Sequence, residues 1–386
     1  MALAAAATVL CGIDVLERDG FVLLAERKVA LITNHTGRTR DGRHIVDVLH
    51  DAANVDLVAL FAPEHGIRGE VDAPVKDGVD LRTGLKIHSL YNPGAGAGRF
   101  RPTDEQLKGV DTLVFDIQDI GVRFYTYIGT MGYAMEEAHR KGLKFIVLDR
   151  PNPIGGLWVD GPTADQDKLG LTAYHPIPLV HGMTAGELAL YFKDVKGLDG
   201  LDLEIVKCEG WKRSQTWEYT GLTWINPSPN MRTVNQAILY PGIALVEGSN
   251  ISVGRGTDTP FELVGAPYID GQKLAALMNS KDLPGVLFYP IEFTPDATKF
   301  AGEKCGGIAI MITDRSKLEP IRVGMDLAWA IHSLFPEWQE ERLVRLVQNQ
   351  IATDAVLSGG YAEAAPTWQA SLAEFKKVRA KYLIYD

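Results

Sequence analysis

The chain has 386 residues, of which 46% are hydrophobic and 23% are charged. This composition is typical of a globular protein with a substantial core, and the length predicts two domains. The formal net charge is -10, from 39 basic and 49 acidic side chains. Because the chain is acidic and contains no run of Lys or Arg, we expect no nucleic-acid partner.

The cysteines and the apolar segments exclude further classes of protein. Cys11, Cys208 and Cys305 are far apart and odd in number, so we expect buried free thiols and no disulfide framework. Residues 1–11 are apolar, but no Lys or Arg precedes them, which favours a processing remnant over a complete signal peptide. No later segment has the run of about 18 apolar residues that a membrane span needs.

The first half of the chain repeats one pattern of an apolar strand, a polar loop and a helix. Strands are predicted at residues 28–33, 56–61, 112–115 and 144–148, and helices at 44–50 and 129–141. This alternation predicts βαβ units and therefore a Rossmann-like, doubly wound, mainly parallel sheet. No G-x-G-x-x-G motif follows the first strand, so a dinucleotide cofactor is not expected, and no other cofactor is implied.

The pattern changes in the second half of the chain. Residues 155–178 have no clear period and predict a long loop over the active-site cleft. Thr184 and Glu187 have the spacing of a helix capping box, and a strand follows at 203–206. Beyond residue 260 we expect strands at 285–293 and 307–313, a helix at 324–334 and a helical tail. The predicted domains are a Rossmann-like domain at 12–260 and a smaller α+β domain at 261–386.

The loop after the second predicted strand is the first candidate for an active site. It contains Glu64, His65 and Arg68 where ligands bind to open α/β sheets, beyond the carboxyl ends of the strands. The structural alternative is that Glu64 caps the next helix and that the other two side chains are solvated.

Carboxylates follow the next two predicted strands as well. Glu64 together with Asp116 or Asp119 would supply the pair of acids that glycoside hydrolysis requires. Asp116 could instead pair with Arg123, and Asp119 could cap a turn. Asp116, Asp119 and Asp149 could also form a Mg²⁺ site. The histidines lack the close spacing of zinc ligands, so no zinc site is predicted.

Several motifs in one order carry a family resemblance. They are Gly12-Ile13-Asp14, Ile32-Thr33-Asn34-His35-Thr36-Gly37, Ala62-Pro63-Glu64-His65-Gly66, Asp116-Ile117-Gln118-Asp119-Ile120-Gly121-Val122-Arg123-Phe124-Tyr125-Thr126-Tyr127, Asp149-Arg150-Pro151-Asn152-Pro153, Pro227-Ser228-Pro229-Asn230-Met231, and Glu247-Gly248-Ser249-Asn250 with Gly254-Arg255-Gly256-Thr257. Through them the chain, from about Gly12 to Tyr385, resembles the family once called domain of unknown function 1343. Its members are known as exo-β-N-acetylmuramidases of glycoside hydrolase family 171.

The resemblance implies release of N-acetylmuramic acid from the non-reducing ends of peptidoglycan fragments, in cell-wall turnover and recycling. It implies a Rossmann-like domain, a smaller C-terminal domain and an active site in the cleft between them. The family's catalytic glutamate matches Glu64. Members with export signals imply a periplasmic or secreted location, and a cytoplasmic location stays open because this chain has no intact signal.

We therefore expect Glu64 to be the principal catalytic carboxylate, with His65 and either Asp116 or Asp119 as helpers. An arginine should bind the lactyl carboxylate of the sugar, with Arg123 the first choice and Arg255 the second. The full set of expected substrate-binding residues is Asn34, Arg68, Gln118, Arg123, Tyr125, Tyr127, Asp149, Asn152, Asn230, Arg232, Glu247, Asn250 and Arg255.

Three alternatives stay open at this point. The substrate's acetamide could act as the nucleophile in substrate-assisted catalysis. The protein could bind muropeptides without cleaving them. It could also be a Mg²⁺-dependent phosphoester hydrolase built on the three aspartates.

Overall fold

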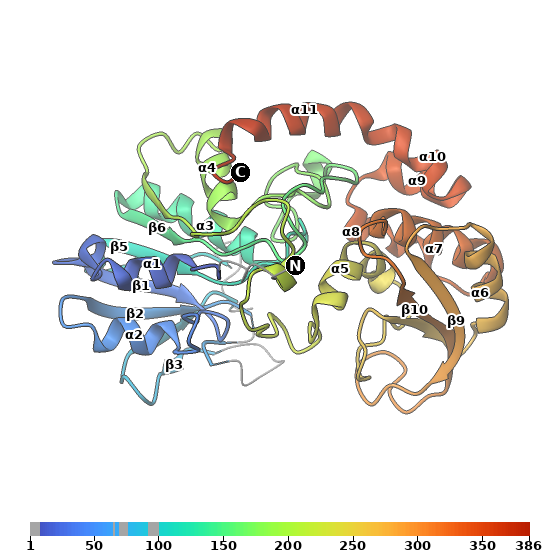
Figure 1. The fold of residues 1–386 in the computed structure, drawn as a ribbon, viewed down its shortest axis with the longest axis horizontal. Helices are drawn as coiled ribbons and strands as arrows, with labels where there is room; N and C mark the ends of the chain where they lie inside the picture. The colour runs from blue at the N-terminus through green and yellow to red at the C-terminus, as the bar shows by residue number, and fades with distance from the viewer. Residues whose placement is uncertain (1–7, 65, 69–75, 92–99) are drawn as a thin grey trace, which may run out of the picture.

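The structure is a computed structural model, and it describes residues 8–64, 66–68, 76–91 and 100–386 (Figure 1). Its larger sheet has the strand order β3-β4-β2-β1-β5-β6-β7. The strands are β1 (Lys28–Thr33), β2 (Asp56–Ala62), β3 (Gly78–Val79), β4 (Lys86–Ser89), β5 (Thr112–Asp116), β6 (Lys144–Leu148) and β7 (Asp202–Val206). All neighbours pair in parallel except β3 and β4. The predicted doubly wound, mainly parallel sheet is confirmed.

Helices cover both faces of this sheet, which explains why its central strands are apolar throughout. Val29 and Leu31 of β1 pack on the side of α1 (Gly12–Arg18) and α2 (Ile45–Asp51). Ala30 and Ile32 pack on the side of α3 (Tyr127–Lys141) and α4 (Ala185–Val195). Successive side chains of a strand point to opposite faces, so one continuous apolar run builds two cores.

The chain reverses its direction across the sheet at β1. It passes from β1 to β2 on one side and later enters β5 on the other side of β1. The carboxyl ends of β1 and β5 therefore flank a topological switch point, where open α/β sheets bind their ligands. The predicted capping box of α4 is confirmed, because Thr184 Oγ1 accepts from Glu187 N at 3.2 Å and Glu187 Oε2 accepts from Thr184 N at 3.1 Å.

The second unit is built on a smaller antiparallel sheet with the order β8-β10-β9. Its strands are β8 (Leu263–Ala266), β9 (Val286–Phe293) and β10 (Cys305–Ile312), and its helices include α5 (Val234–Ile243), α6 (Gly271–Ser280), α7 (Pro320–Leu334), α8 (Val344–Val347) and α9 (Gln350–Gly359).

Helix α5 belongs to the second unit. It packs so closely on α7 that a Cβ atom at Gly242 would lie 1.8 Å from the Pro320 carbonyl oxygen. The second unit thus begins ahead of the boundary that we expected near residue 260, because the apolar sequence of α5 gives no sign of which core it enters.

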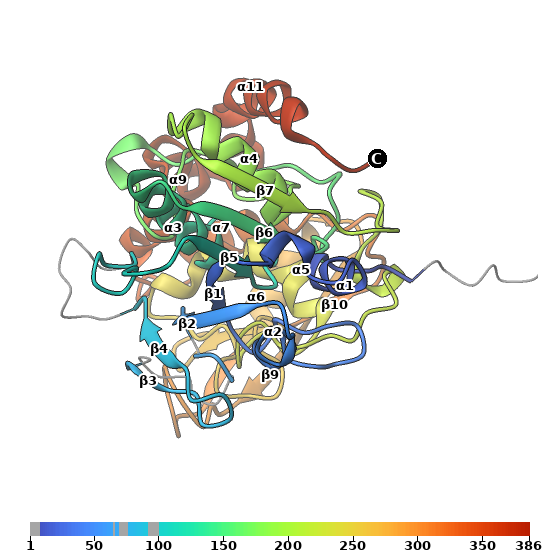
Figure 2. The same cartoon turned by 90° about the vertical axis from the view of Figure 1, so that its left-hand side faces the viewer.

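After α10 (Tyr361–Ala364), the chain returns to the first unit through α11 (Gln369–Arg379) (Figure 2). Arg379 Nη2 donates to the Gly182 carbonyl oxygen at 2.6 Å, and Ile384 N donates to Glu187 Oε1 at 2.9 Å. The predicted loop at 155–178 contains one short 3-10 helix, η3 (Gln166–Lys168), and contacts the second unit, where Asp165 N donates to the Gln348 carbonyl oxygen at 2.7 Å.

Two expectations about composition can be compared with this fold. All three cysteines are free and buried, as predicted. None of the helices in the described ranges is both long and apolar enough to cross a membrane.

Candidate active site

Glu64 lies two residues beyond β2, on the edge of the sheet that holds the carboxyl ends of the parallel strands. Pro63 ends the strand, and the Glu64 side chain is exposed. Thr126, the residue before α3, donates through Oγ1 to Glu64 Oε2 at 3.3 Å. Glu64 therefore faces the start of α3 from a solvent-accessible position, as a catalytic carboxylate must. His65, its predicted helper, lies outside the described residues.

Asp119 is the second carboxylate at this edge, and its environment is very different. The side chain is buried, and Oδ2 accepts from Gly121 N at 2.7 Å. Its other oxygen, Oδ1, is buried without a hydrogen-bond partner among the described residues. Burial raises the pKa of Asp119 from 3.8 to about 7, although the backbone N–H groups of Gly121 and Ile120 oppose the shift. Asp119 can therefore hold a proton near neutral pH.

Three tyrosines connect the two carboxylates. Tyr125 stacks edge-on against Tyr127, with ring centroids 5.1 Å apart, and against Tyr240 at 5.8 Å. Burial raises the pKa of each hydroxyl, and the charges of Glu64 and Asp119 raise all three further. Both acids thus lie within electrostatic reach of the same aromatic cluster. Tyr127 OH donates to a backbone carbonyl at 2.7 Å, whereas Tyr125 OH is buried without a partner in the described part of the chain.

The second unit contributes charged side chains to the same place. Arg255 Nε lies 2.5 Å from Glu247 Oε1, and its guanidinium lies over the Phe261 ring, 5.5 Å from the centroid. The Lys299 ammonium donates to the Glu247 carbonyl oxygen. Tyr240 is within reach of Glu247 and Arg255 as well as of Glu64 and Asp119. Tyr240 therefore lies near the candidate residues of both units.

This arrangement places two carboxyl groups in environments of different polarity, so that one can act as a general acid and the other as a general base. One carboxylate is exposed, and the other is desolvated and can be protonated near pH 7. The tyrosines offer apolar faces on which a sugar ring can pack. Arg255 and Lys299 add positive charge that can bind an anionic substituent.

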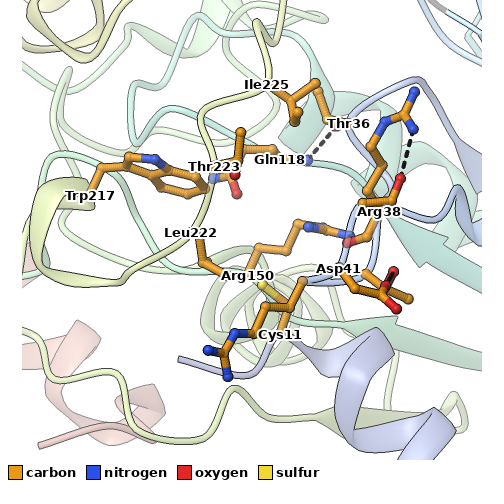
Figure 3. A pocket seen from close by; sticks show the side chains of 13 residues that line it. Cys11, Thr36, Arg38, Asp41, Gln118, Arg150, Trp217, Leu222, Thr223 and Ile225 are labelled. Carbon is orange, nitrogen blue, oxygen red and sulfur yellow. Dashed lines mark hydrogen bonds between the residues drawn. The ribbon is translucent and has the colours of Figure 1, made fainter. Parts of the chain in front are cut away.

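Two other predicted binding residues, Asn34 and Asn230, lie near the tyrosines, and a third, Gln118, lines a different pocket. Asn34 Oδ1 accepts from Thr36 N at 2.9 Å, and its amide lies beside the Tyr127 hydroxyl. Asn230 is buried in the loop that accepts the Tyr127 hydrogen bond. The Gln118 side chain lies in a separate pocket (Figure 3).

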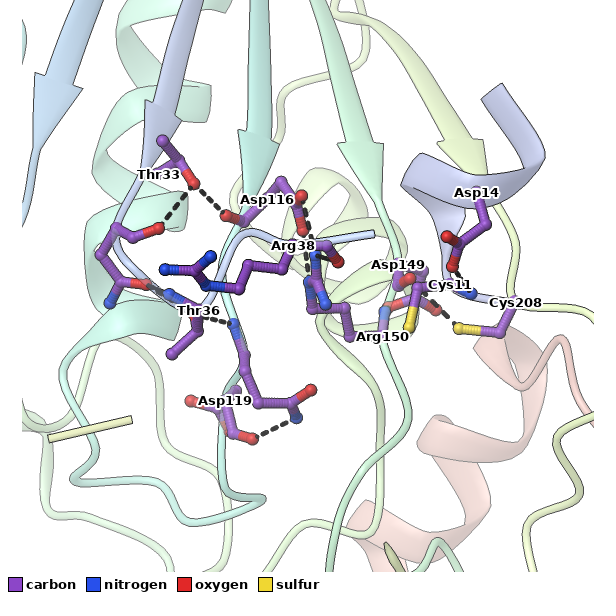
Figure 4. Close-up of polar contacts among 12 residues, drawn as sticks. Cys11, Asp14, Thr33, Thr36, Arg38, Asp116, Asp119, Asp149, Arg150 and Cys208 are labelled. Atoms are coloured by element: carbon purple, nitrogen blue, oxygen red, sulfur yellow. Dashed lines mark hydrogen bonds and ion pairs between the residues drawn. The ribbon is translucent and has the colours of Figure 1, made fainter. Parts of the chain in front are cut away.

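Asp116 and Asp149 are corrections to the expected site (Figure 4). Asp116 is fully buried and forms a two-bond ion pair with Arg150, in which Nη2 lies 2.9 Å from Oδ2. Asp149 is also fully buried and accepts four hydrogen bonds, including those from Thr184 Oγ1 at 2.7 Å and Tyr385 OH at 2.6 Å. Protein groups already use these carboxylates, so neither is available to a substrate or to the Mg²⁺ ion of the phosphoesterase hypothesis. Among the residues that the structure describes, no three His, Cys, Asp or Glu side chains gather as metal ligands.

Arg123, the first choice for the lactyl carboxylate, is a structural residue. It is fully buried, and its two terminal nitrogens donate to four backbone carbonyl oxygens at 2.7–3.1 Å, those of Pro162, Ile177, Leu346 and Val347. Burial lowers the pKa of Arg123 to about 9. This side chain joins the two units and cannot reach a ligand.

Four further predicted binding residues also make contacts within the protein. Arg68 pairs with Asp47 and Asp80 at 2.8 and 3.0 Å, away from the tyrosine cluster. Asn152 Nδ2 donates to the Met183 carbonyl oxygen at 3.1 Å. Arg232 forms an exposed ion pair, and Asn250 Nδ2 donates to a carbonyl oxygen of the second unit at 2.9 Å. These contacts explain their positions without a substrate.

Sequence reasoning missed Tyr240, Lys299 and Thr126. Tyr240 lies in α5, where an apolar helix predicts only core packing. Lys299 belongs to an irregular segment between β9 and β10 with no motif of its own. Thr126 lies within the predicted motif of residues 116–127, and this was the one signal that the sequence offered.

Comparisons with known proteins agree with this architecture. The family model described as exo-beta-N-acetylmuramidase NamZ, N-terminal, matches residues 29–235, and its C-terminal counterpart matches residues 238–385. The chain is 42% identical over 381 residues to the peptidoglycan beta-N-acetylmuramidase NamZ of Bacillus subtilis (strain 168), covering 97% of this chain and 91% of that protein.

Two crystal structures of DUF1343 family proteins from Bacteroides fragilis NCTC 9343 are similar to the whole fold. One has a TM-score of 0.90 at 35% identity, and the other a TM-score of 0.79 at 29% identity; each comparison covers 98% of this chain and 99% of the other. The chain therefore belongs to the exo-beta-N-acetylmuramidase NamZ family, formerly DUF1343.

Proposed function

We propose that this chain is an exo-β-N-acetylmuramidase that hydrolyses N-acetylmuramic acid from the non-reducing ends of peptidoglycan fragments. Family membership and the 42% identical B. subtilis relative support this activity. One observation carries the site assignment. The exposed Glu64 and the buried Asp119 lie close enough to one tyrosine cluster to raise the pKa of its hydroxyls, and Asp119 Oδ1 has no hydrogen-bond partner among the described residues. Peptidoglycan as the substrate favours a periplasmic or secreted location, which cell fractionation would test.

The two carboxylates receive different roles in this proposal. Asp119 can hold a proton near neutral pH, and it protonates the glycosidic oxygen as the bond to the anomeric carbon breaks. Glu64 is exposed, and it either takes a proton from attacking water or accepts the N–H of the 2-acetamido group. A thiazoline analogue of N-acetylmuramic acid distinguishes these routes, because it mimics the ring that forms only when the acetamide attacks. Inhibition far below the concentration of the parent sugar supports the acetamide route.

The lactyl carboxylate of the substrate is assigned to Arg255, with Lys299 beside it. Both cations touch Glu247, so a substrate anion would share a site that is already organised by one carboxylate. The Phe261 ring packs against the Arg255 guanidinium in a cation–π contact. This assignment replaces Arg123 with the second arginine that we considered.

The activity is tested by release of para-nitrophenol from a β-N-acetylmuraminide, with the β-N-acetylglucosaminide as the substrate control. Glu64→Gln should lower kcat/KM by about two decades or more with an unchanged circular dichroism spectrum. Glu363→Gln, an exposed change in α10, is the matched variant and should keep full activity. If wild type binds a muropeptide but leaves the muraminide intact, the protein is a binding protein and the proposed hydrolase function is wrong.

A further inference from the structure

A second pocket opens at the topological switch point of the large sheet. Its volume is about 310 Å³, and it lies beyond the carboxyl ends of β1 and β5, under the segment of residues 217–225 (Figure 3). Glu64, Asp119 and the tyrosine cluster are not part of its wall. Its lining includes the side chains of Thr36, Arg38, Arg40, Gln118, Arg150 and Trp217.

Three arginines give this pocket hydrogen-bond donors that no group in the described ranges accepts. Arg150 binds Asp116 and the Arg38 carbonyl oxygen, but its Nη1 donates to none of the described residues. Arg38 uses Nε and Nη1 on backbone carbonyl oxygens at 3.1 and 2.9 Å and leaves Nη2 unused within the described ranges. The exposed guanidinium of Arg40 has no described partner, although its backbone N–H donates to Asp14 Oδ1 at 2.7 Å. Guanidinium groups with N–H donors to spare bind carboxylates and phosphates.

Two buried polar atoms in the wall also lack partners. Gln118 is 3% exposed and Trp217 is 7% exposed, and both line the pocket. Gln118 Nε2 donates to two backbone carbonyl oxygens at 2.7 and 2.9 Å, which fixes the amide, yet its Oε1 accepts from nothing in the described part of the protein. Trp217 Nε1 likewise has no acceptor there. Buried polar groups are almost always paired, so one unused acceptor and one unused donor in the same wall indicate a ligand with hydroxyl groups.

Asp41 is the one acidic side chain in the described lining, and it is already occupied. It pairs with Arg43 at 2.8 Å and accepts from Thr39. The charge that remains available to a ligand is therefore positive. The volume lies at the lower end of small-molecule sites, which start at about 300 Å³, and excludes a dinucleotide.

We propose that this pocket binds a hydroxylated organic anion of monosaccharide size, a sugar carboxylate or a sugar phosphate. Its acidic group binds Arg40, Arg38 and Arg150, and its hydroxyl groups pair with Gln118 Oε1 and Trp217 Nε1. The pocket has neither Glu64 nor Asp119 in its wall, although Gln118 Nε2 donates to the Asp119 carbonyl oxygen at 2.7 Å. It gives the protein a second small-molecule ligand besides its glycan substrate.

Isothermal titration calorimetry of the full chain tests this site with three probes: glucuronate, glucose 6-phosphate and uncharged glucose. We expect at least one anion to bind at millimolar concentrations or below and glucose to give no heat of binding. Binding of glucuronate alone identifies a carboxylate site, and binding of glucose 6-phosphate alone identifies a phosphate site. If neither anion binds, the proposal is overturned.

Three variants locate the binding. Arg40→Ala should raise the dissociation constant of the anion about tenfold, which is the typical effect of losing one charged hydrogen bond. Arg82→Ala is the matched control, because this exposed arginine lines a different pocket and pairs with Asp47 and Asp51, and this variant should bind the anion like wild type. Trp217→Phe keeps an aromatic ring but removes the N–H group and part of the indole, and it should also weaken binding. Wild-type affinity in both Arg40→Ala and Trp217→Phe places the ligand elsewhere and overturns the proposal.

The two proposals fail independently. Glu64→Gln should bind the anion with wild-type affinity, because Glu64 does not contact this pocket. Arg40→Ala should cleave the muraminide at the wild-type rate in the absence of added anion.

Discussion

Asp119→Asn separates the cost of burying a charge from the role of this side chain in the reaction. Asparagine has nearly the volume of aspartate, and its carbonyl oxygen can still accept the hydrogen bond from Gly121 N that now measures 2.7 Å. The variant should therefore fold like wild type. It differs from wild type in that it cannot ionise.

The expected size of the effect follows from the pKa of Asp119. Burial raises this pKa from 3.8 in an open chain to about 7 in the fold. Between these values the folded state keeps a proton that the unfolded state has released, so wild-type stability falls as the pH rises through the window. At 1.36 kcal/mol per unit the full loss is about 4 kcal/mol. The amide of the variant does not ionise, so its free energy of unfolding does not fall in this way. Relative to wild type, Asp119→Asn should therefore gain up to about 4 kcal/mol in free energy of unfolding between pH 4 and pH 8.

Urea unfolding measured near pH 4.5 and near pH 8 gives this difference directly, with wild type and variant compared at each pH. Other buried groups that titrate, such as His181, cancel in the comparison. Asp167→Asn removes an exposed carboxylate and should show no pH-dependent difference. A free-energy difference between Asp119→Asn and wild type that is equal at both pH values would refute our description of Asp119 as a desolvated acid. The same variant should lose about two decades of muramidase activity.

Three further substitutions test other parts of the argument. Arg123→Lys should lower the free energy of unfolding by about 3 kcal/mol, measured by urea unfolding, because an ammonium cannot reach all four carbonyl oxygens that the guanidinium serves; an unchanged midpoint contradicts the structural role. Tyr385→Phe leaves Asp149 without one of its donors and should cost about 1–3 kcal/mol in the same assay; equal stability would mean that this contact is weak. Arg255→Gln should raise KM for the muraminide about tenfold with little change in kcat, and a fall in kcat alone would remove Arg255 from substrate binding.

The strands of the large sheet were predictable because their signal is local. β1 and β6 have the predicted bounds to the residue, since parallel strands covered on both faces are apolar from end to end and stop at polar loops. The capping box at Thr184 was equally local. The exposed position of Glu64 also agrees with its place in a short loop between a strand and a turn.

The roles of the charged residues were less predictable because their partners are distant in sequence. Arg123 follows a strand, as a ligand-binding arginine would, but the carbonyl oxygens that it binds lie 39 to 224 residues away. One of the hydrogen bonds that Asp149 accepts comes from Tyr385, 236 residues later in the chain. No local sequence pattern predicts such contacts. The position of Tyr240 between the carboxylates depends in the same way on how α5 packs, which an apolar helix leaves open.

The return of residues 379–386 to the first unit has a consequence for the order in which the protein is made. Asp149, at the end of a central strand, keeps an unfilled hydrogen-bond position until Tyr385 has been synthesised. Arg213 N also needs the Asp386 carbonyl oxygen, at 2.7 Å. A ribosome that translates this message therefore releases the whole second unit before the first can close its core. The domain that begins to fold first is completed last.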